Sequence, residues 1–280
     1  MNKVVYISDY FASQILGGGE LNDDELLNQL SSNGVLVEKI NSSQVKSFDI
    51  NSNDKFIISN FVNLNRDVIN KLITECSYVI YEHDHKYLKN RNPAVFDNFK
   101  APKDFIVNKD FYENAVKVLC QSSFHKSIVE KNIEIKNIYN ISGNLWSDDS
   151  INLMSDLSYV EKKDCYSIID SNIDHKNTYQ CVNYCKLKKL NFELISSRNY
   201  LEFLSKLSKN DKLLFLPKTP ETLSRIVVEA KMMGVKVVTN KNVGATHEPW
   251  FNKNGKDLID VMKNRKETIP LKILEFLNEQ

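Results

Sequence analysis

The sequence predicts an α/β protein built from two units, each a parallel β-sheet with helices packed on both of its faces. Short β-branched runs alternate with helix-length amphipathic stretches, which is typical of parallel sheets whose strands are connected through helices. After about residue 150 the same alternation starts again. We therefore expect a first domain over residues 1–155 and a second over residues 156–280.

The expected elements follow the alternation in order. Strands are expected in the first unit at residues 4–8, 35–40, 56–59, 78–81, 117–120 and 137–141, with helices at 22–33, 66–76, 112–116 and 124–132. In the second unit, strands are expected at 166–170, 192–195, 213–216 and 236–239, with helices at 178–189, 200–206 and 223–233. Gly34 and Gly234 would end two of these helices, because glycine readily adopts the left-handed conformation found there.

Ligands of open parallel sheets bind beyond the carboxyl ends of the strands. The loops after Ile7, Tyr81, Asp170 and Leu216 are therefore the expected locations of functional residues. Two stacked units would place those loops facing each other across a cleft.

Composition narrows the functional classes. Lys and Arg number 37 against 36 Asp and Glu, a balance that argues against a general nucleic-acid binder. No apolar run reaches the roughly 18 residues that a membrane span requires. The first strand turns polar at Ser8 and Asp9, too early for a signal peptide. The five cysteines show no paired framework, so we expect a cytoplasmic protein.

A Gly-Gly-Gly-Glu segment at residues 17–20 follows the first strand and opens a helix. Gly18 and Gly19 would let backbone N–H groups approach a ligand closely, and a helix N-terminus favours an anion. The spacing is not that of a dinucleotide fingerprint, and no acidic residue closes the second strand, so a nicotinamide cofactor is disfavoured. The alternative is a merely flexible loop.

Two glutamates flank the start of the helix expected at residues 223–233. Glu221 precedes it and Glu229 lies about two turns inside, roughly 10–12 Å apart along the axis at 1.5 Å per residue. That separation matches the reach from a sugar, past a diphosphate, to a ribose, and the helix N-terminus between them would meet the diphosphate. The alternative is one capping glutamate and one solvated glutamate.

Histidines and lysines gather after the strand at residues 78–81. In an extended segment His83 and His85 would share one face, which allows a metal site, a structural pair, or a His83 that contacts a ligand. No third metal ligand has a supporting spacing, so we expect no metal. Lys86, Lys89, Arg91, Lys100 and Lys103 form a basic stretch that is either solvated or suited to an acidic acceptor. Elsewhere, Cys181 and Cys185 are expected to pack in a core, and Trp146 and Trp250 to pack loops.

Taken in order, these motifs resemble a known family. Glu221, seven residues, then Glu229-Ala-x-x-x-Gly, followed by the strand at 236–239 and Gly244, is similar to the donor-binding signature of retaining glycosyltransferases of the GT-B fold, the family 4-like group that includes sucrose synthase and bacterial mannosyltransferases. Residues 17–20 resemble that family's Gly-Gly-x-Glu loop. His83 resembles its histidine after the fourth strand.

The resemblance implies two Rossmann-like domains, the first on the acceptor side and the second binding a nucleotide-sugar. It implies metal-independent, retaining transfer of a hexose to a carbohydrate or lipid-linked acceptor, with no cofactor beyond the donor substrate. His83 and Glu221 would contact the transferred sugar as the candidate catalytic residues, and Glu229 the ribose. The remaining residues expected to bind the donor are Gly18, Gly19, Lys176, Thr222 and Arg225.

The chain departs from the family at one position. The arginine that usually follows the first strand of the second domain is absent, and Ser171 stands near its place, while Lys176 matches the family's lysine. Arg225 or Lys218 would then compensate, or turnover has been lost. Two alternatives stay open: a nucleotide-sugar epimerase of the same architecture, and a non-catalytic nucleotide-sugar or glycan-binding protein. DNA glucosylation is disfavoured by the balanced charge.

Overall fold

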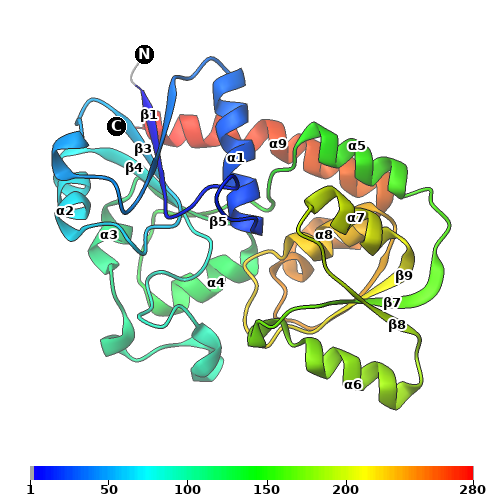
Figure 1. Cartoon of the computed structure of the whole chain (residues 1–280). Helices are drawn as coiled ribbons and strands as arrows, with labels where there is room; N and C mark the ends of the chain where they lie inside the picture. The colour runs from blue at the N-terminus through cyan, green and yellow to red at the C-terminus, as the bar shows by residue number, and fades with distance from the viewer. Residues whose placement is uncertain (1–2, 280) are drawn as a thin grey trace. The chain divides into compact units, whose positions relative to one another are not determined.

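A computed structural model describes residues 3–279 of the chain. The chain forms two compact units, each built on its own parallel sheet (Figure 1), which confirms the predicted α/β class. Unit 1 comprises the chain up to Leu145 together with the chain from Arg265 onward, and unit 2 comprises Trp146–Asn264. Every helix within residues 3–279 falls short of the length and hydrophobicity that a bilayer crossing requires.

Unit 1 contains a six-stranded parallel sheet in the order β2-β1-β3-β4-β5-β6. Its strands are β1 (Val4–Ser8), β2 (Val37–Asn41), β3 (Lys55–Ile58), β4 (Ser77–Tyr81), β5 (Lys117–Cys120) and β6 (Ile138–Asn140). Its helices are α1 (Gly18–Ser32), α2 (Arg66–Glu75), α3 (Lys109–Asn114) and α4 (Ser123–Asn132), with short 3-10 turns η1 (Ser47–Asp49), η2 (Pro93–Val95), η3 (Asp97–Phe99) and η4 (Lys103–Phe105).

The central strands of this sheet are mostly apolar because both faces are covered there, whereas the edge strands β2 and β6 are partly exposed. In β1, Val5 and Ile7 point into a core shared with α2, α3 and α4, while Val4 and Tyr6 point into a second core shared with α1. Successive side chains of a strand alternate between faces, so a doubly covered strand has no solvent-facing positions. All five residues of β1 are buried.

Unit 2 contains a four-stranded parallel sheet in the order β10-β9-β7-β8. Its strands are β7 (Lys163–Ile169), β8 (Phe192–Ile195), β9 (Asn210–Phe215) and β10 (Lys236–Thr239). Its helices are α5 (Asp148–Leu157), α6 (Thr178–Lys188), α7 (Tyr200–Ser208) and α8 (Arg225–Met232), with the turns η5 (Asp174–Lys176), η6 (Gly244–His247) and η7 (Pro249–Asn252). Figure 1 shows α6 on one face of the sheet and α5, α7 and α8 on the other. Cys181 and Cys185 of α6 are buried in the core between α6 and the sheet.

The long helix α9 (Gly255–Asn278) was not predicted, and it changes the domain boundaries. Its first part buries Leu258 and Met262 in the core of unit 2, whereas Ile273 and Phe276 are buried in the core of unit 1. Residues 265–280 therefore group with the first unit rather than the second. Pro270 lies inside α9, where it removes one helical hydrogen bond, and an internal proline argues against a helix when only the sequence is read.

The other boundary also differs from the expected 155/156, because α5 belongs to unit 2. Ile151 and Met154 of α5 are buried in the unit 2 core, together with residues of α7 and α8. The division consequently falls between Leu145 and Trp146.

The strand orders locate the crevice of each sheet. In unit 1 the chain runs from β1 to β2 on one side and then crosses to β3 on the other, and in unit 2 β7 lies in the same way between β8 and β9. Ligands of such sheets bind at this reversal, beyond the carboxyl ends of the strands. The relevant loops are therefore those after β1 and β3 in unit 1, and those after β7 and β9 in unit 2.

Candidate functional site

The glycine-rich segment after β1 forms the first turn of α1. This helix begins at Gly18, four residues before the predicted start, with Gly17 as an extended N-cap. A Cβ on Gly17 would overlap the Glu20 carboxylate, whereas a Cβ on Gly19 would lie 3.5 Å from Nδ1 of His83, an ordinary contact. A side chain at position 17 would therefore displace only the flexible end of Glu20. Gly18 and Gly19 bring backbone N–H groups that have no acceptor inside the helix.

His83 follows β4 and is hydrogen-bonded through both ring nitrogens. Nε2 lies 2.9 Å from Oδ1 of Asp23, Nδ1 lies 2.7 Å from the Gln121 side-chain amide, and the ring stacks on Tyr81. Asp23 is an acceptor and the Gln121 amide a donor, so Nε2 carries the proton. The structure therefore brings the predicted residues Gly19 and His83 together, but a ligand reaching a ring nitrogen would have to replace Gln121 or Asp23.

A buried ion pair lies directly beside His83. The Glu82 carboxylate accepts hydrogen bonds from the backbone N–H of His85, from Nζ of Lys86 at 2.9 Å and from the Tyr112 hydroxyl. Burial opposes ionisation of Glu82, but Lys86 and the other partners outweigh it and hold the pKa of Glu82 well below its usual range. Burial likewise disfavours the Lys86 ammonium, yet Asp84 and Glu82 raise its pKa.

Lys86 is consequently buried. The interpretation of the basic stretch as a solvated surface is therefore wrong for this residue. Its side chain is 2% exposed, and it also contacts Asp84 at 3.0 Å. Arg91, which is exposed, pairs with Asp84 at the same distance. The stretch is therefore in part a set of internal contacts that fix the loop after β4.

His85 lies in a different environment from His83, which separates the two histidines of the motif. His85 bonds the Tyr87 hydroxyl through Nδ1 and meets His125 edge to face, with ring centroids 5.1 Å apart. Burial lowers the pKa of His85 to about 4 and that of His125 well below its usual value. Within the described chain, no group of three or more His, Cys, Asp or Glu side chains is arranged to hold a metal ion.

In unit 2, Lys176 and Glu221 meet at the crevice between β7 and β9. Lys176 ends the turn η5 after β7, and its Nζ lies 2.9 Å from Oε1 of Glu221 in the loop after β9. The backbone of Glu221 is fixed on both sides, because its N–H donates to Asn242 and its carbonyl accepts from Gly244. Both charged side chains remain partly exposed. The predicted donor-binding residue Lys176 and the candidate catalytic residue Glu221 are therefore in contact and accessible.

Helix α8 begins at Arg225, two residues later than predicted. Its N-cap, Ser224, adopts a left-handed conformation with φ 74°, unusual for a residue other than glycine. The Ser224 side chain is buried, and Oγ has no hydrogen-bond partner among residues 3–279. Ser224 is not among the residues predicted for the site, although a serine just before a helix is a common N-cap signal. Thr222, half-buried, lies between Glu221 and this helix start.

Glu229 lies one turn after Arg225, not two turns inside the helix, and its side chain is buried. Oε1 of Glu229 accepts from Nε1 of Trp146 at 2.9 Å and from the Tyr200 hydroxyl at 2.7 Å. Nε of Arg225 lies 3.4 Å from the same oxygen, and the guanidinium stacks 4.5 Å over Trp146. The alternative of a solvated glutamate is therefore wrong. Trp146 holds this carboxylate rather than only packing a loop, and Tyr200 was not anticipated.

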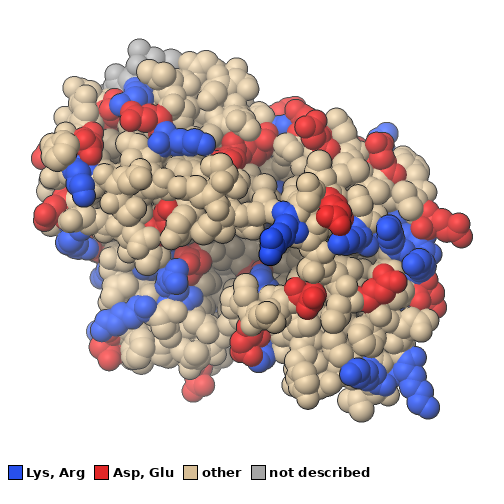
Figure 2. All heavy atoms as spheres, viewed as in Figure 1, with Lys and Arg blue, Asp and Glu red and all other residues tan. Residues whose placement is uncertain are grey.

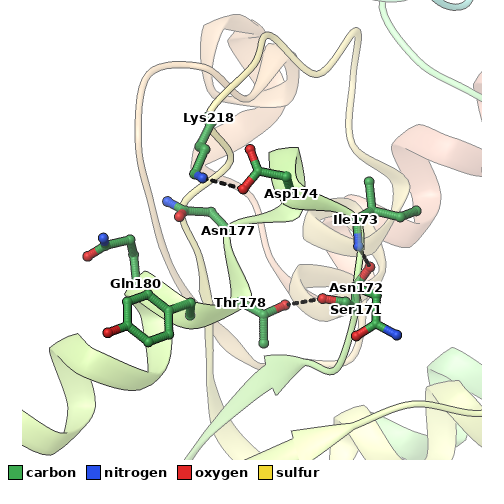
Figure 3. A pocket seen from close by; sticks show the side chains of 9 residues that line it. Ser171, Asn172, Ile173, Asp174, Asn177, Thr178, Gln180 and Lys218 are labelled. Carbon is green, nitrogen blue, oxygen red and sulfur yellow. Dashed lines mark hydrogen bonds and ion pairs between the residues drawn. The ribbon is translucent and has the colours of Figure 1, made fainter.

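A cavity of about 340 Å³ opens beside this crevice, at the start of α6 (Figure 3). Its walls are the loop after β7, the first turn of α6 and Lys218, which pairs with Asp174 at 2.5 Å. Lys218 and Arg225 were the expected substitutes for the missing arginine. Lys218 is exposed and its pair can open to a ligand, whereas the Arg225 side chain is only 8% exposed and already lies beside Glu229.

Comparisons with known proteins identify the fold. No protein-family model matches the chain, and no curated protein matches it in sequence. Among solved structures, an α-glucosyltransferase in complex with UDP and a 13-mer DNA aligns with a TM-score of 0.55 at 12% identity, covering 98% of this chain and 94% of that one.

Two further solved structures show the same likeness. Anabaena HepE in complex with UDP and glucose gives 0.54 at 12% identity, covering 99% and 97% of the two chains. The α,α-trehalose-phosphate synthase (UDP-forming) from Burkholderia vietnamiensis gives 0.56 at 7% identity, covering 99% and 93%. Since each alignment spans both parallel sheets, the chain has the two-sheet α/β fold of GT-B glycosyltransferases.

Proposed function

We propose that this protein is a glycosyltransferase that transfers a hexose from a nucleotide-sugar, with UDP as the nucleotide, to a carbohydrate acceptor. The observation that carries the proposal is the Lys176–Glu221 pair at the crevice between β7 and β9, beside the start of α8. A cation, a carboxylate and a helix N-terminus are the three elements needed for a diphosphate and the hydroxyls of its sugar. The solved structures of the same fold that contain UDP support the choice of nucleotide.

The donor is assigned to unit 2 as follows. Lys176 binds the diphosphate and Glu221 binds hydroxyls of the transferred sugar, each giving up part of its contact with the other. Backbone N–H groups at the start of α8, together with Oγ of Ser224, are assigned as further donors to the phosphate. Glu229, one turn further along, binds the ribose. Gly18, Gly19 and His83 of unit 1 are assigned to the phosphates and the sugar, as the family resemblance implies.

The proposed transfer is retaining and independent of metal. The bond between C1 of the sugar and the phosphate oxygen breaks, and an acceptor hydroxyl forms the new bond to C1 on the same face. The hydroxyl proton passes to the leaving phosphate oxygen, whose charge Lys176 and the backbone N–H groups stabilise. Activity is expected to survive EDTA. Full loss with chelator that Mn²⁺ or Mg²⁺ restores would contradict this part of the proposal.

A carbohydrate acceptor fits the charges at the carboxyl edge of the sheet in unit 1. Glu20 is half-buried and Asp84 is 39% exposed, while the nearby Lys86 is buried in its own ion pairs. Carboxylates accept hydrogen bonds from hydroxyl groups and repel phosphates. On the face seen in Figure 2, basic and acidic residues are interspersed rather than gathered in a basic patch. These features favour an uncharged glycan over a nucleic acid as acceptor.

A thermal-shift screen of nucleoside diphosphates and their sugars tests the proposal, followed by turnover assays on sugar acceptors. We expect stabilisation by UDP and by UDP-hexoses, and release of UDP only when an acceptor is present. Conversion of the donor without an acceptor would instead identify an epimerase. Binding without turnover across a broad acceptor panel would favour a binding protein that has lost catalysis along with the missing arginine.

A further inference from the structure

The two carboxylate oxygens of Glu229 differ in the hydrogen bonds that they accept. Oε1 accepts one hydrogen bond from the Trp146 indole and one from the Tyr200 hydroxyl, at 2.9 and 2.7 Å. A carboxylate oxygen has two lone pairs, so these two donors saturate Oε1. Any further hydroxyl that binds this carboxylate must use Oε2.

Both donors are fixed in direction. The indole N–H of Trp146 can only donate. Burial and the Glu229 charge raise the pKa of Tyr200, so that its hydroxyl stays protonated and also donates. The two contacts therefore cannot reverse, and together they define the plane and rotation of the carboxylate.

Arg225 offsets the electrostatic cost of burying the Glu229 carboxylate. Glu229 and Arg225 have side chains only 3% and 8% exposed, and their charges lie 3.4 Å apart. A buried carboxylate without a cation would take up a proton or leave the site, because desolvation is costly. The guanidinium is itself held by stacking, 4.5 Å from the centre of the Trp146 ring and 6.0 Å from that of Tyr200.

We propose that Trp146, Tyr200 and Arg225 are positioning residues that present Oε2 of Glu229 to the ribose of the bound nucleotide, and that this makes the site selective for ribonucleotides over deoxyribonucleotides. The inference rests on the proposed function and adds the nucleotide selectivity and the residues that create it. A fixed, ionised oxygen gains most from the two hydroxyls of a ribose. When one hydroxyl is missing, that oxygen loses a partner it cannot replace by rotating.

The test compares UDP with 2′-deoxy-UDP and 3′-deoxy-UDP by calorimetry on the full-length protein. For the wild type we expect at least one deoxy analogue to bind about 10- to 100-fold more weakly than UDP, the range for a hydrogen bond to a charged group. In Tyr200→Phe, which keeps the ring, the carboxylate is free to turn. The ratio should then fall to about threefold or less, through weaker UDP binding and unchanged binding of the deoxy analogue.

Three further variants complete the test. Tyr184→Phe removes a hydroxyl from an exposed tyrosine of α6 and should leave the ratio at the wild-type value. Glu229→Gln should abolish the ratio and sets the lower limit. Trp146→Phe removes the other donor and should act like Tyr200→Phe, with thermal unfolding recorded for each variant to establish that it is folded.

The outcomes separate this inference from the proposed function. If Tyr200→Phe and Trp146→Phe are folded and keep the wild-type ratio while Glu229→Gln loses it, the positioning role is overturned and the ribose contact stands. If UDP binds but the wild type does not discriminate against either deoxy analogue, the selectivity is overturned while nucleotide binding stands. Failure of every nucleoside diphosphate and nucleotide-sugar to bind overturns the proposed function itself.

Discussion

Each of the two sheets carries a lysine–glutamate ion pair beyond the carboxyl end of a strand. The two pairs have the same N–O distance, but one is buried and the other is accessible to solvent. In unit 1, Nζ of Lys86 lies 2.9 Å from Glu82, with side chains 2% and 0% exposed. In unit 2, Nζ of Lys176 lies 2.9 Å from Glu221, with side chains 28% and 15% exposed. Equivalent contacts on equivalent edges therefore differ in what they can do.

The difference follows from the remaining partners of each carboxylate. Glu82 is also bonded by the backbone N–H of His85 and by the Tyr112 hydroxyl, so opening its pair would leave a charge buried. Glu221 and Lys176 can exchange each other for a ligand while water still reaches them. The buried pair stabilises the fold, and the accessible pair is the one suited to bind a substrate.

The largest expected effect comes from breaking the two pairs by the same substitution. Lys86→Met should lower the free energy of unfolding by about 3–5 kcal/mol, the cost of leaving a buried carboxylate unpaired. Lys176→Met should change stability by less than about 1 kcal/mol but weaken nucleoside diphosphate binding. Urea unfolding and calorimetry of both variants measure this. Equal destabilisation by the two substitutions would contradict the distinction between the pairs.

His83 tests whether the edge of unit 1 also takes part in transfer. His83→Ala should reduce turnover on the order of 100-fold, the scale of a misplaced reacting group, while nucleoside diphosphate affinity stays nearly intact. The matched control is His247→Ala, which removes an exposed histidine of unit 2. Normal turnover in a folded His83→Ala protein would leave His83 with the structural role that its bonds to Asp23 and Gln121 already provide.

The two glutamates of unit 2 should fail differently. Glu229→Ala should weaken UDP and UDP-hexose binding equally, by about 1.5–3 kcal/mol, because both ligands carry the ribose. Glu221→Ala should spare UDP and penalise the intact donor, with a further loss in rate if the contact strengthens in the transition state. Calorimetry with both ligands distinguishes them. Equal losses from both substitutions, or none from either, would sink the assignment.

A smaller effect concerns pH and the buried histidines of unit 1. Burial lowers the pKa of His85 to about 4, below the ordinary value of 6.5, so the folded protein binds this proton less well than the unfolded chain. The contribution of His85 to the free energy of unfolding is fully present above pH 6.5 and decreases as the pH falls towards 4. His125 acts in the same direction. Between pH 7 and 5.5 the loss from His85 is about 1 kcal/mol.

Urea unfolding at the two pH values measures that loss. His85→Gln should make the difference smaller, and His247→Gln in unit 2 should leave it unchanged. An identical pH dependence in wild type and His85→Gln would exclude His85 as its source.

Local pattern was enough to predict both sheets. Strand β5 is found at the predicted residues because its last three residues form a buried apolar run, which is visible in the sequence. The edge strand β8 also lies at its predicted residues, although its two middle residues are exposed. The order of motifs along the chain also placed Lys176 and Glu221 at adjacent strand ends, since parallel strands bring their carboxyl ends to one edge. These features depend only on neighbours in sequence and on the regular geometry of a sheet.

Tertiary structure decided what depends on partners distant in the chain. Helix α9 contains Pro270 and divides its apolar side chains between two cores, so no local pattern reveals where it belongs. The same holds for burial: Lys86 and Lys176 have similar sequence surroundings, and only packing makes one internal and the other accessible. Trp146 and Tyr200 reach Glu229 from 83 and 29 residues away. Such contacts arise when folding joins separate segments, because hydrogen bonding and desolvation act through space and not along the sequence.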